Sequence, residues 1–492
     1  MKLIILCALF APIIYFALRQ KKWYLYLLFA FMGVLPEQFS MRLHESLPLL
    51  TATRVLILIA MGFWTFDKWK TRSFRFPKSL MLFLAVNVIV SLVNLRYGTG
   101  DIKRIFLLFF ERVFLVIMLM DTIRDKEEFH RCIDFSIMGC AALAVIGIVQ
   151  TVFDYDISSV LHITETIASI QLSGRMGLVR AYGTYNAISY GCYCAFMSGL
   201  ILYRLFNTKN LWHAAAFAMN FVALVCTFTR SAWLCLAGIF VLVLLVYRMK
   251  LIRRLIPALG IALALSVVLC CFQPKLYKAF MQTGKSSINT VIGVLPDSVT
   301  SLLKPSNSST ASGDTEEPDA TEPADNEPFF ELDEDFGMNA TDPAYSRMAQ
   351  WTAVEYMLMD GQALFGYGYN ALPEGRIHFF FDRWEAKWVP TTFLDVGLVA
   401  LLMEGGFVGA LSFLGLLGYM LVVALRKRSR DGQMDFCWLT IFMIPLFLLL
   451  NFLASFMFAS VVWLYIALFY THTQLSLPSA EHSTEQKGEN HE

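Results

Sequence analysis

Charged side chains are scarce in this sequence. Only 16% of its 492 residues are Asp, Glu, Lys or Arg and 57% are apolar, whereas a soluble globular protein has about 25% charged residues. The apolar residues occur in long runs, and the mean hydropathy is +0.56. This composition excludes a soluble enzyme, a nucleic-acid-binding domain and a disordered chain. The formal net charge of +1 says little, because in a membrane protein the positions of the charges matter more than their sum.

Two further absences concern one long segment. Lys and Arg do not occur between residues 305 and 345, where twelve acidic residues accompany Ser, Thr and Pro. This composition predicts a solvated insert, with calcium binding as the alternative. None of the ten cysteines lies between residues 273 and 392. Cys192-x-Cys194 and Cys270-Cys271 lie in apolar runs without His or acidic co-ligands, which favours packing over metal binding. We therefore expect no metal and no cofactor.

Apolar runs long enough to cross a bilayer recur along the chain. By the rule that a crossing helix needs about 20 apolar residues, we predict an all-α polytopic membrane protein with about 12 to 13 transmembrane helices. The first run could be taken for a signal peptide, but basic residues occupy the place of its cleavage site. The predicted spans are residues 3–18, 23–36, 54–66, 79–95, 105–120, 132–153, 188–206, 211–228, 232–247, 255–272, 405–425, 436–453 and 458–472.

Basic residues gather in alternate loops, which predicts the orientation. Six loops hold 21 of the 40 Lys and Arg residues, at 19–22, 68–78, 124–131, 204–209, 248–254 and 426–430. Loops of this kind face the cytoplasm, so we expect a multi-pass membrane protein with its large loop outside.

The chain then divides into four parts. Residues 1–272 form an N-terminal transmembrane bundle with a first outer loop at 154–187. Residues 273–404 form a large extracytoplasmic loop that contains the acidic insert. Residues 405–472 form the C-terminal transmembrane helices, and residues 473–492 form a cytoplasmic polar tail.

Order is expected to resume after the insert. Asp342-Pro343 is a helix-start signal, and the apolar residues Met348, Trp351, Val354 and Leu358 follow at helical spacing. The glycine-rich stretch 365–370 predicts a loop. Residues 384–404 are predicted to form a second amphipathic helix, with tryptophans at the membrane interface.

Four arginines on the predicted outer side are not needed for orientation: Arg175, Arg180, Arg230 and Arg347. Arginine is always charged and grips phosphate oxygens bidentately. Several arginines at one water–lipid boundary therefore suit a lipid-linked diphosphate. The alternative for each is an interfacial side chain that snorkels or pairs with a neighbouring acid.

Four stretches have recognisable spacing. TFTRSAWL (227–234) lies at a helix junction, Arg347-x3-Trp351 precedes LFGYGYN (364–370), Asp395 precedes EGGFVG (404–409), and ten residues separate Arg180 from Gly191. Together with the two-loop topology of the whole chain, they resemble the superfamily of O-antigen ligases and O-antigen or capsular polysaccharide polymerases. The motifs are of moderate specificity.

The departures from that family matter for the choice of acceptor. Its ligases usually have a His-Asn or His-Ser pair about nine residues before the Glu of Glu-x-Gly, and Asp395-Val396 occupies that place here. The missing histidine favours a polymerase-like member over a ligase. A second Arg-x10-Gly match is also missing, which weakens a strict assignment as polymerase.

The resemblance implies an inverting, metal-independent glycosyl transfer at the outer leaflet of the bacterial plasma (inner) membrane. The donor would be a glycan on undecaprenyl diphosphate, the acceptor another lipid-linked repeat unit, and further partners a flippase and a chain-length regulator; nucleic acid has no part. The expected catalytic residues are Arg230 and Arg347 at the diphosphate and Asp395 as the base. Substrate-binding residues would be Arg175, Arg180, Trp351, Tyr367 and Tyr369, with the aromatic rings stacking on sugars. Core packing is the alternative for Trp351, and capping the last outer helix is the alternative for Asp395.

Other observations keep alternatives open. Glu111-Arg112 lies inside a predicted span, where each charge is expected to pair with another helix. Asp154-Tyr155-Asp156 has a metal-binding form that is frequent by chance. Rival functions are a flippase or transporter of lipid-linked glycans, a ligase that transfers to a lipid or protein, and a sensor. A flippase needs polar groups through the membrane centre, whereas the middle of most predicted spans here is apolar.

Overall fold

The computed structural model describes most of the helical part of the chain. The described residues are 22–35, 50–69, 76–97, 100–155, 178–208, 210–247, 249–281, 350–369, 379–382, 387–390, 396–429, 434–453 and 460–476, without 186, 352 and 356, together with isolated positions before residue 42.

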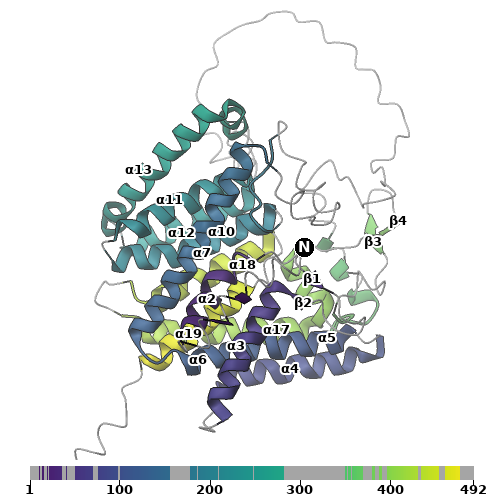
Figure 1. The fold of residues 1–492 in the computed structure, drawn as a ribbon. Helices are drawn as coiled ribbons and strands as arrows, with labels where there is room; N and C mark the ends of the chain where they lie inside the picture. The colour runs from purple at the N-terminus through teal and green to yellow at the C-terminus, as the bar shows by residue number, and fades with distance from the viewer. Residues whose placement is uncertain are drawn as a thin grey trace, which may run out of the picture.

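The described part of the chain is an all-α bundle (Figure 1). Its first half contains α2 (Trp23–Phe31), α3 (Ala52–Trp69), α4 (Lys78–Asn94), the short 3₁₀ turn η1 (Leu95–Tyr97), α5 (Gly100–Leu107), the π-helical segment η2 (Leu108–Phe114), α6 (Leu115–Thr122) and α7 (Lys126–Val152). Its second half contains α10 (Ala187–Asn207), α11 (Leu211–Cys226), α12 (Arg230–Tyr247), α13 (Met249–Phe272), α17 (Gly397–Lys427), α18 (Phe436–Leu453) and α19 (Ser460–Leu475).

The protein is an integral membrane protein by the length and composition of these helices. Within the described ranges, six are long and apolar enough to cross a bilayer: Lys78–Tyr97, Lys126–Val152, Arg230–Tyr247, Leu255–Phe272, Gly397–Lys427 and Phe436–Leu453. Shorter apolar helices cover Ala52–Phe66 and Leu211–Cys226. Every predicted span from 23–36 onward overlaps a described helix, so the prediction of a polytopic α-helical protein is confirmed.

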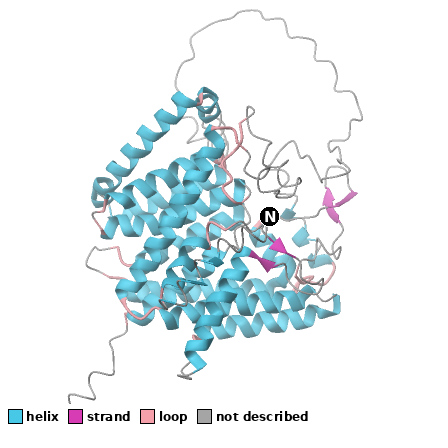
Figure 2. Ribbon diagram, viewed as in Figure 1, coloured by secondary structure: helices cyan, strands magenta, loops and turns pink. Residues whose placement is uncertain are grey.

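Two short antiparallel strand pairs lie on one side of the bundle (Figure 2). They are β1 (Ser40–Met41) with β2 (Leu50–Thr51), and β3 (Phe379–Asp382) with β4 (Lys387–Pro390). The second pair corrects the sequence analysis, because the helix expected over 384–404 begins only at Gly397. Aromatic and β-branched residues such as Phe380, Trp388 and Val389 favour strands, and this preference outweighs the apparent amphipathic period.

Helix α17 is broken in its first third. Gly406 has φ 60° and ψ −168°, which divides the helix into residues 397–405 and 407–427. Only glycine adopts that backbone conformation without strain. The break lies inside the predicted motif EGGFVG and positions the site described below.

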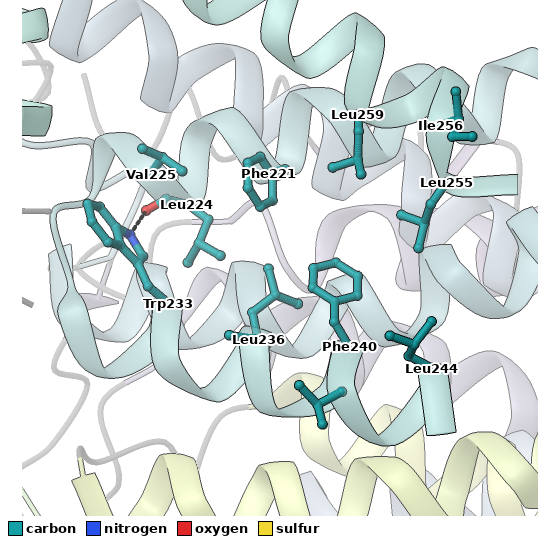
Figure 3. A pocket seen from close by; sticks show the side chains of 12 residues that line it. Phe221, Leu224, Val225, Trp233, Leu236, Phe240, Leu244, Leu255, Ile256 and Leu259 are labelled. Carbon is teal, nitrogen blue, oxygen red and sulfur yellow. Dashed lines mark hydrogen bonds between the residues drawn. The ribbon is translucent and has the colours of Figure 1, made fainter. Parts of the chain in front are cut away.

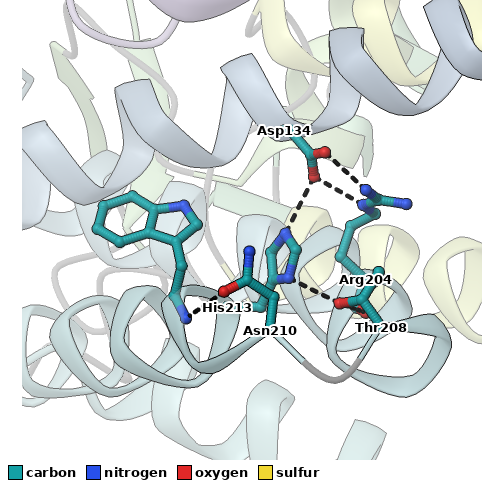
Figure 4. A network of polar contacts seen from close by, with 6 residues as sticks. Asp134, Arg204, Thr208, Asn210 and His213 are labelled. Carbon is teal, nitrogen blue, oxygen red and sulfur yellow. Dashed lines mark hydrogen bonds and ion pairs between the residues drawn. The ribbon is translucent and has the colours of Figure 1, made fainter.

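A polar network ties α7, α10 and α11 together at the predicted inner end (Figure 4). Both carboxylate oxygens of Asp134 accept from Arg204, at 2.6 Å each, and Oδ1 also lies 3.0 Å from Nε2 of the buried His213. The other ring nitrogen of His213 bonds the Thr208 hydroxyl at 2.8 Å. The network satisfies polar groups that would otherwise be costly to bury between these helices.

Candidate functional site

The motif TFTR forms the turn from α11 to α12. Phe228 has a positive φ of 52°, which is unusual for a bulky residue and indicates strain that the surroundings maintain. The Thr227 hydroxyl donates to the Leu224 carbonyl at 2.7 Å and accepts from the Thr229 amide at 3.1 Å. Both threonines are buried. The two threonines therefore hold the turn together from within.

Arg180 binds this turn from the preceding loop. Its Nε donates to the Thr227 carbonyl at 2.8 Å and its Nη2 to the Thr229 hydroxyl at 3.1 Å. A Cβ on Gly191 would lie 2.9 Å from the Cβ of Thr229 and 3.0 Å from Oγ1 of Thr227, so only glycine fits there. The Arg180-x10-Gly191 spacing and the TFTR motif are thus two halves of one structure.

The Arg180 loop and the TFTR turn together bring two arginine side chains to one helix junction. Arg180 is half-buried, and Arg230 is the first residue of the 18-residue helix α12. The N-terminus of a helix is electropositive and has backbone N–H groups available to an anion. The Arg180–Arg230 junction, as we call it, is therefore suited to a multiply charged anion such as a diphosphate.

An apolar groove begins beside the junction and follows α11, α12 and α13 (Figure 3). Trp233, one turn after Arg230, lies at one end, where its ring N–H donates to the Leu224 carbonyl at 3.0 Å. The lining is almost wholly apolar and the volume is about 560 Å³. Along α12 the lining runs to Leu244, and it continues on α13 through Leu255, Ile256 and Leu259. Several of these side chains are exposed, so the groove lies on an open apolar surface of helices that are apolar enough to cross a bilayer.

A second structure forms where the loop LFGYGYN meets the break in α17. Because the helix is broken at Gly406, the Met403 and Glu404 carbonyls are free to accept from the amides of Tyr367 and Gly368, at 2.8 and 3.1 Å. The amides of Phe407 and Val408 donate in turn to loop carbonyls, at 2.8 and 3.1 Å. In an unbroken helix those same carbonyls and amides would bond one another. The loop is therefore inserted into the helical hydrogen-bond ladder, an arrangement that we call the loop–helix clasp.

Side chains from α4 and α5 hold the clasp. Asn94 donates to the Phe365 carbonyl at 2.7 Å, and Arg104 donates to the Glu404 carbonyl at 3.0 Å. The buried Asp101 accepts from the Tyr369 amide at 3.2 Å. Residues more than 250 positions apart in sequence are thus brought together at one end of the bundle.

Charged side chains of the π-helical segment adjoin the clasp. Glu111 pairs with Arg54 of α3 at 3.1 Å, and Arg112 lies over the Trp463 ring of α19 at 5.7 Å. Each charge in this span therefore interacts with another helix, which confirms the expectation from the sequence. Burial raises the pKa of the Tyr369 hydroxyl, and the nearby Glu404 raises it further. Tyr369 is consequently a protonated hydrogen-bond donor at neutral pH.

The predicted site residues divide into three groups. Arg175, Arg347 and Asp395 lie outside the described residues, although their described neighbours meet: the Val396 amide donates to Gln350 Oε1 at 3.0 Å. Arg180 and Arg230 share the junction. Trp351 packs on Phe452 with ring centroids 5.7 Å apart, and the hydroxyl of the buried Tyr367 donates to Asp360 at 2.9 Å.

Asp154, the first residue of the possible metal-binding motif Asp154-Tyr155-Asp156, has a structural role. Asp154 accepts from the Val179 amide at 2.8 Å and has a φ of 52°, so its carboxylate shapes the entry to the Arg180 loop. Among the described residues, no group of three or more His, Cys, Asp and Glu side chains is arranged to hold a metal ion.

The sequence analysis missed the partners that complete the second structure. Arg54, Asp101 and Arg104 were not predicted as site residues. The signal that could have found them is their position, since all three lie at the outer ends of predicted spans, on the same side as the motifs.

Comparison with known proteins points to one family. Residues 214–414 match a family model described as O-antigen ligase. The matched stretch includes most of α11, the TFTR turn, the groove and the clasp. Searches of curated proteins and of solved structures returned no match.

Proposed function

We propose that this chain, whose residues 214–414 match a family model described as O-antigen ligase, is a glycosyltransferase of the O-antigen ligase and polymerase superfamily that works at the outer leaflet of the bacterial plasma membrane. Its donor is a glycan on undecaprenyl diphosphate, and its acceptor is a hydroxyl of another lipid-linked repeat unit. The transfer inverts the anomeric centre and needs no metal.

One observation supports the proposed chemical class of the donor. The Arg180–Arg230 junction lies directly beside an apolar groove that Trp233 joins at one end and Leu244 lines farther along α12. A cationic centre next to a long apolar surface is complementary to an amphiphile with an anionic head and a hydrocarbon tail. A polyprenyl diphosphate has this form, whereas a nucleotide sugar lacks the tail.

In the proposed reaction the acceptor hydroxyl oxygen attacks the anomeric carbon on the face opposite the diphosphate. The hydroxyl proton passes to the Asp395 carboxylate, which acts as the general base. The bond between the anomeric carbon and the phosphate oxygen breaks, and undecaprenyl diphosphate leaves with the electron pair. Arg180, Arg230 and Arg347 stabilise the negative charge that develops on the leaving group.

The residue at position 395 supports the choice of acceptor. The family's ligases have a histidine where this chain has Asp395, which favours polymerisation of repeat units over transfer to a lipid core. A flippase is the rival function, and the location of the accumulated intermediate distinguishes the two.

The test is complementation of a strain that lacks this protein, with glycan length resolved by electrophoresis. Arg230→Ala and Arg347→Ala should abolish the polymer ladder at normal membrane levels, because losing one such charge costs about 10²- to 10³-fold in rate. Asp395→Asn should reduce turnover far more than substrate binding. Arg131→Ala is the matched control, since that arginine is exposed at the predicted inner end and pairs with Glu127.

Two results would contradict the proposal. A normal ladder with Arg230→Ala would remove the junction from the reaction. Accumulation of single lipid-linked units on the cytoplasmic face, instead of the outer face, in the strain lacking the protein would indicate a flippase.

A further inference from the structure

We propose that the polar cluster between the π-helical segment and the loop–helix clasp is a second ligand subsite, which binds the sugar residues of the acceptor glycan. The cluster consists of Arg54, Glu111, Arg112, Tyr369 and Glu404. The inference rests on the proposed function, because only a glycan-transferring enzyme would need two such sites at one end of the bundle.

Burying charged side chains at this position costs free energy that a purely structural role would not require. Two adjacent charges inside an apolar span are expensive unless function or pairing retains them. They lie on a seven-residue π-helical segment, and π-helical turns inside α-helices occur frequently at functional sites. Packing alone would be served as well by apolar residues at both positions.

The cluster is partly accessible. The side chains of Arg54 and Glu111 are 23% and 18% exposed, and Arg112, Tyr369 and Glu404 are half-buried. By contrast, Arg104 and Asp101, which hold the clasp, are fully buried. The partly exposed side chains of the cluster therefore differ from the buried side chains that bond the backbone of the clasp.

The balance of charge separates this cluster from the Arg180–Arg230 junction. The junction combines two arginines with the positive end of α12 and suits an anion. The cluster combines Arg54 and Arg112 with Glu111 and Glu404, so its charges cancel. Donors and acceptors together beside an aromatic ring suit a neutral ligand that is rich in hydroxyl groups, as a sugar is.

The clasp keeps two members of the cluster fixed through their backbones. The Glu404 carbonyl accepts from Arg104 and Gly368, and the Tyr369 amide donates to Asp101. Their side chains are thus held by contacts that a side-chain substitution does not touch. Glu404→Gln and Tyr369→Phe should therefore leave the fold intact while removing a charge and a hydroxyl.

The experiment measures binding of two probes to the full chain in nanodiscs. One probe is undecaprenyl diphosphate. The other is the oligosaccharide released by mild acid from the lipid-linked units that a strain lacking the protein accumulates. Glu404→Gln and Tyr369→Phe should each weaken oligosaccharide binding about tenfold and change undecaprenyl diphosphate binding less than about twofold. Arg230→Ala should show the opposite pattern, and Glu127→Gln, an exposed carboxylate at the predicted inner end, should change neither.

The outcomes separate the two proposals. Wild-type oligosaccharide binding by Glu404→Gln, equal loss of both probes, or no oligosaccharide binding by the wild-type chain would overturn the subsite. If Arg230→Ala loses undecaprenyl diphosphate binding while Glu404→Gln binds the oligosaccharide normally, the donor site is supported and the subsite is refuted. If the wild-type chain binds the oligosaccharide but not undecaprenyl diphosphate, the proposed donor is wrong, and weaker oligosaccharide binding by Glu404→Gln still supports the subsite.

Discussion

Replacing Gly406 by alanine tests the loop–helix clasp most directly. A Cβ at this position would lie 2.4 Å from the carbonyl carbon and oxygen of Leu364 and 2.5 Å from the Phe365 amide nitrogen. All three are backbone atoms, so no side-chain rotation can relieve the overlap. Either the loop moves away or the helix closes its break.

The cost follows from the contacts that would be lost. The backbone conformation of Gly406 is strained for any other residue by about 1–3 kcal/mol. Displacing the loop forfeits the four backbone hydrogen bonds of the clasp, each of which contributes about 1 kcal/mol. We therefore expect Gly406→Ala to destabilise the clasp by about 5–7 kcal/mol if the loop is displaced while the break stays open.

The same helix offers matched controls. A Cβ on Gly415 or Gly418 would meet nothing within 4 Å, and alanine in a helix interior is favoured over glycine by about 0.5–1 kcal/mol. Thermal midpoints of the detergent-purified variants, measured by fluorescence-detected gel filtration, should fall for Gly406→Ala and stay level or rise for the controls. Polymer formation should be lost only in the first variant. Equal midpoints and equal ladders for Gly406→Ala and Gly415→Ala would refute the reasoning.

Two other substitutions have defined outcomes. Gly191→Ala should lower the thermal midpoint and shorten the polymer ladder, because its Cβ would press on the threonines of the TFTR turn. The control Gly238→Ala in α12, where a Cβ meets nothing within 4 Å, should do neither. A harmless Gly191→Ala would disprove the close packing. Arg204→Ala should destabilise the protein by about 2 kcal/mol, because Arg204 is only 11% exposed and Asp134, although 35% exposed, would lose its cation next to a buried histidine. Heating curves should separate this variant from the unaffected control Arg131→Ala. Coincident curves would show that the network is dispensable.

The helices could be predicted from the sequence because apolar length alone determines most of them. The exceptions have physical reasons. The predicted helix over 384–404 includes strand β4, since tryptophans at a membrane interface occur in both structures. The break at Gly406 depends on a loop about forty positions earlier in the chain, and no local pattern of α17 contains that information. The adjacent glycines 405 and 406 were the only local sign of it.

The site was predictable in its parts and not in its assembly. The sequence identified Arg180, Gly191 and the TFTR motif separately, but their mutual contact is a tertiary fact. Similarly, the costly pair Glu111-Arg112 predicted partners on other helices, yet only the packing of α3 and α19 supplies Arg54 and Trp463. The net neutrality of that cluster, which decides its proposed ligand, could be seen only once the helices were in place.

The groove along α11, α12 and α13 has a kinetic consequence. Its lining includes Val241, Leu244 and Ile256, which are 56%, 41% and 60% exposed, and α12 and α13 are apolar enough to cross a bilayer. If the tail of the proposed donor occupies this groove, the donor arrives by lateral diffusion within one leaflet. Encounter frequency is then governed by the mole fraction of the carrier among membrane lipids. Diluting the carrier with inert phospholipid should slow the enzyme even when the amount per volume of sample is unchanged.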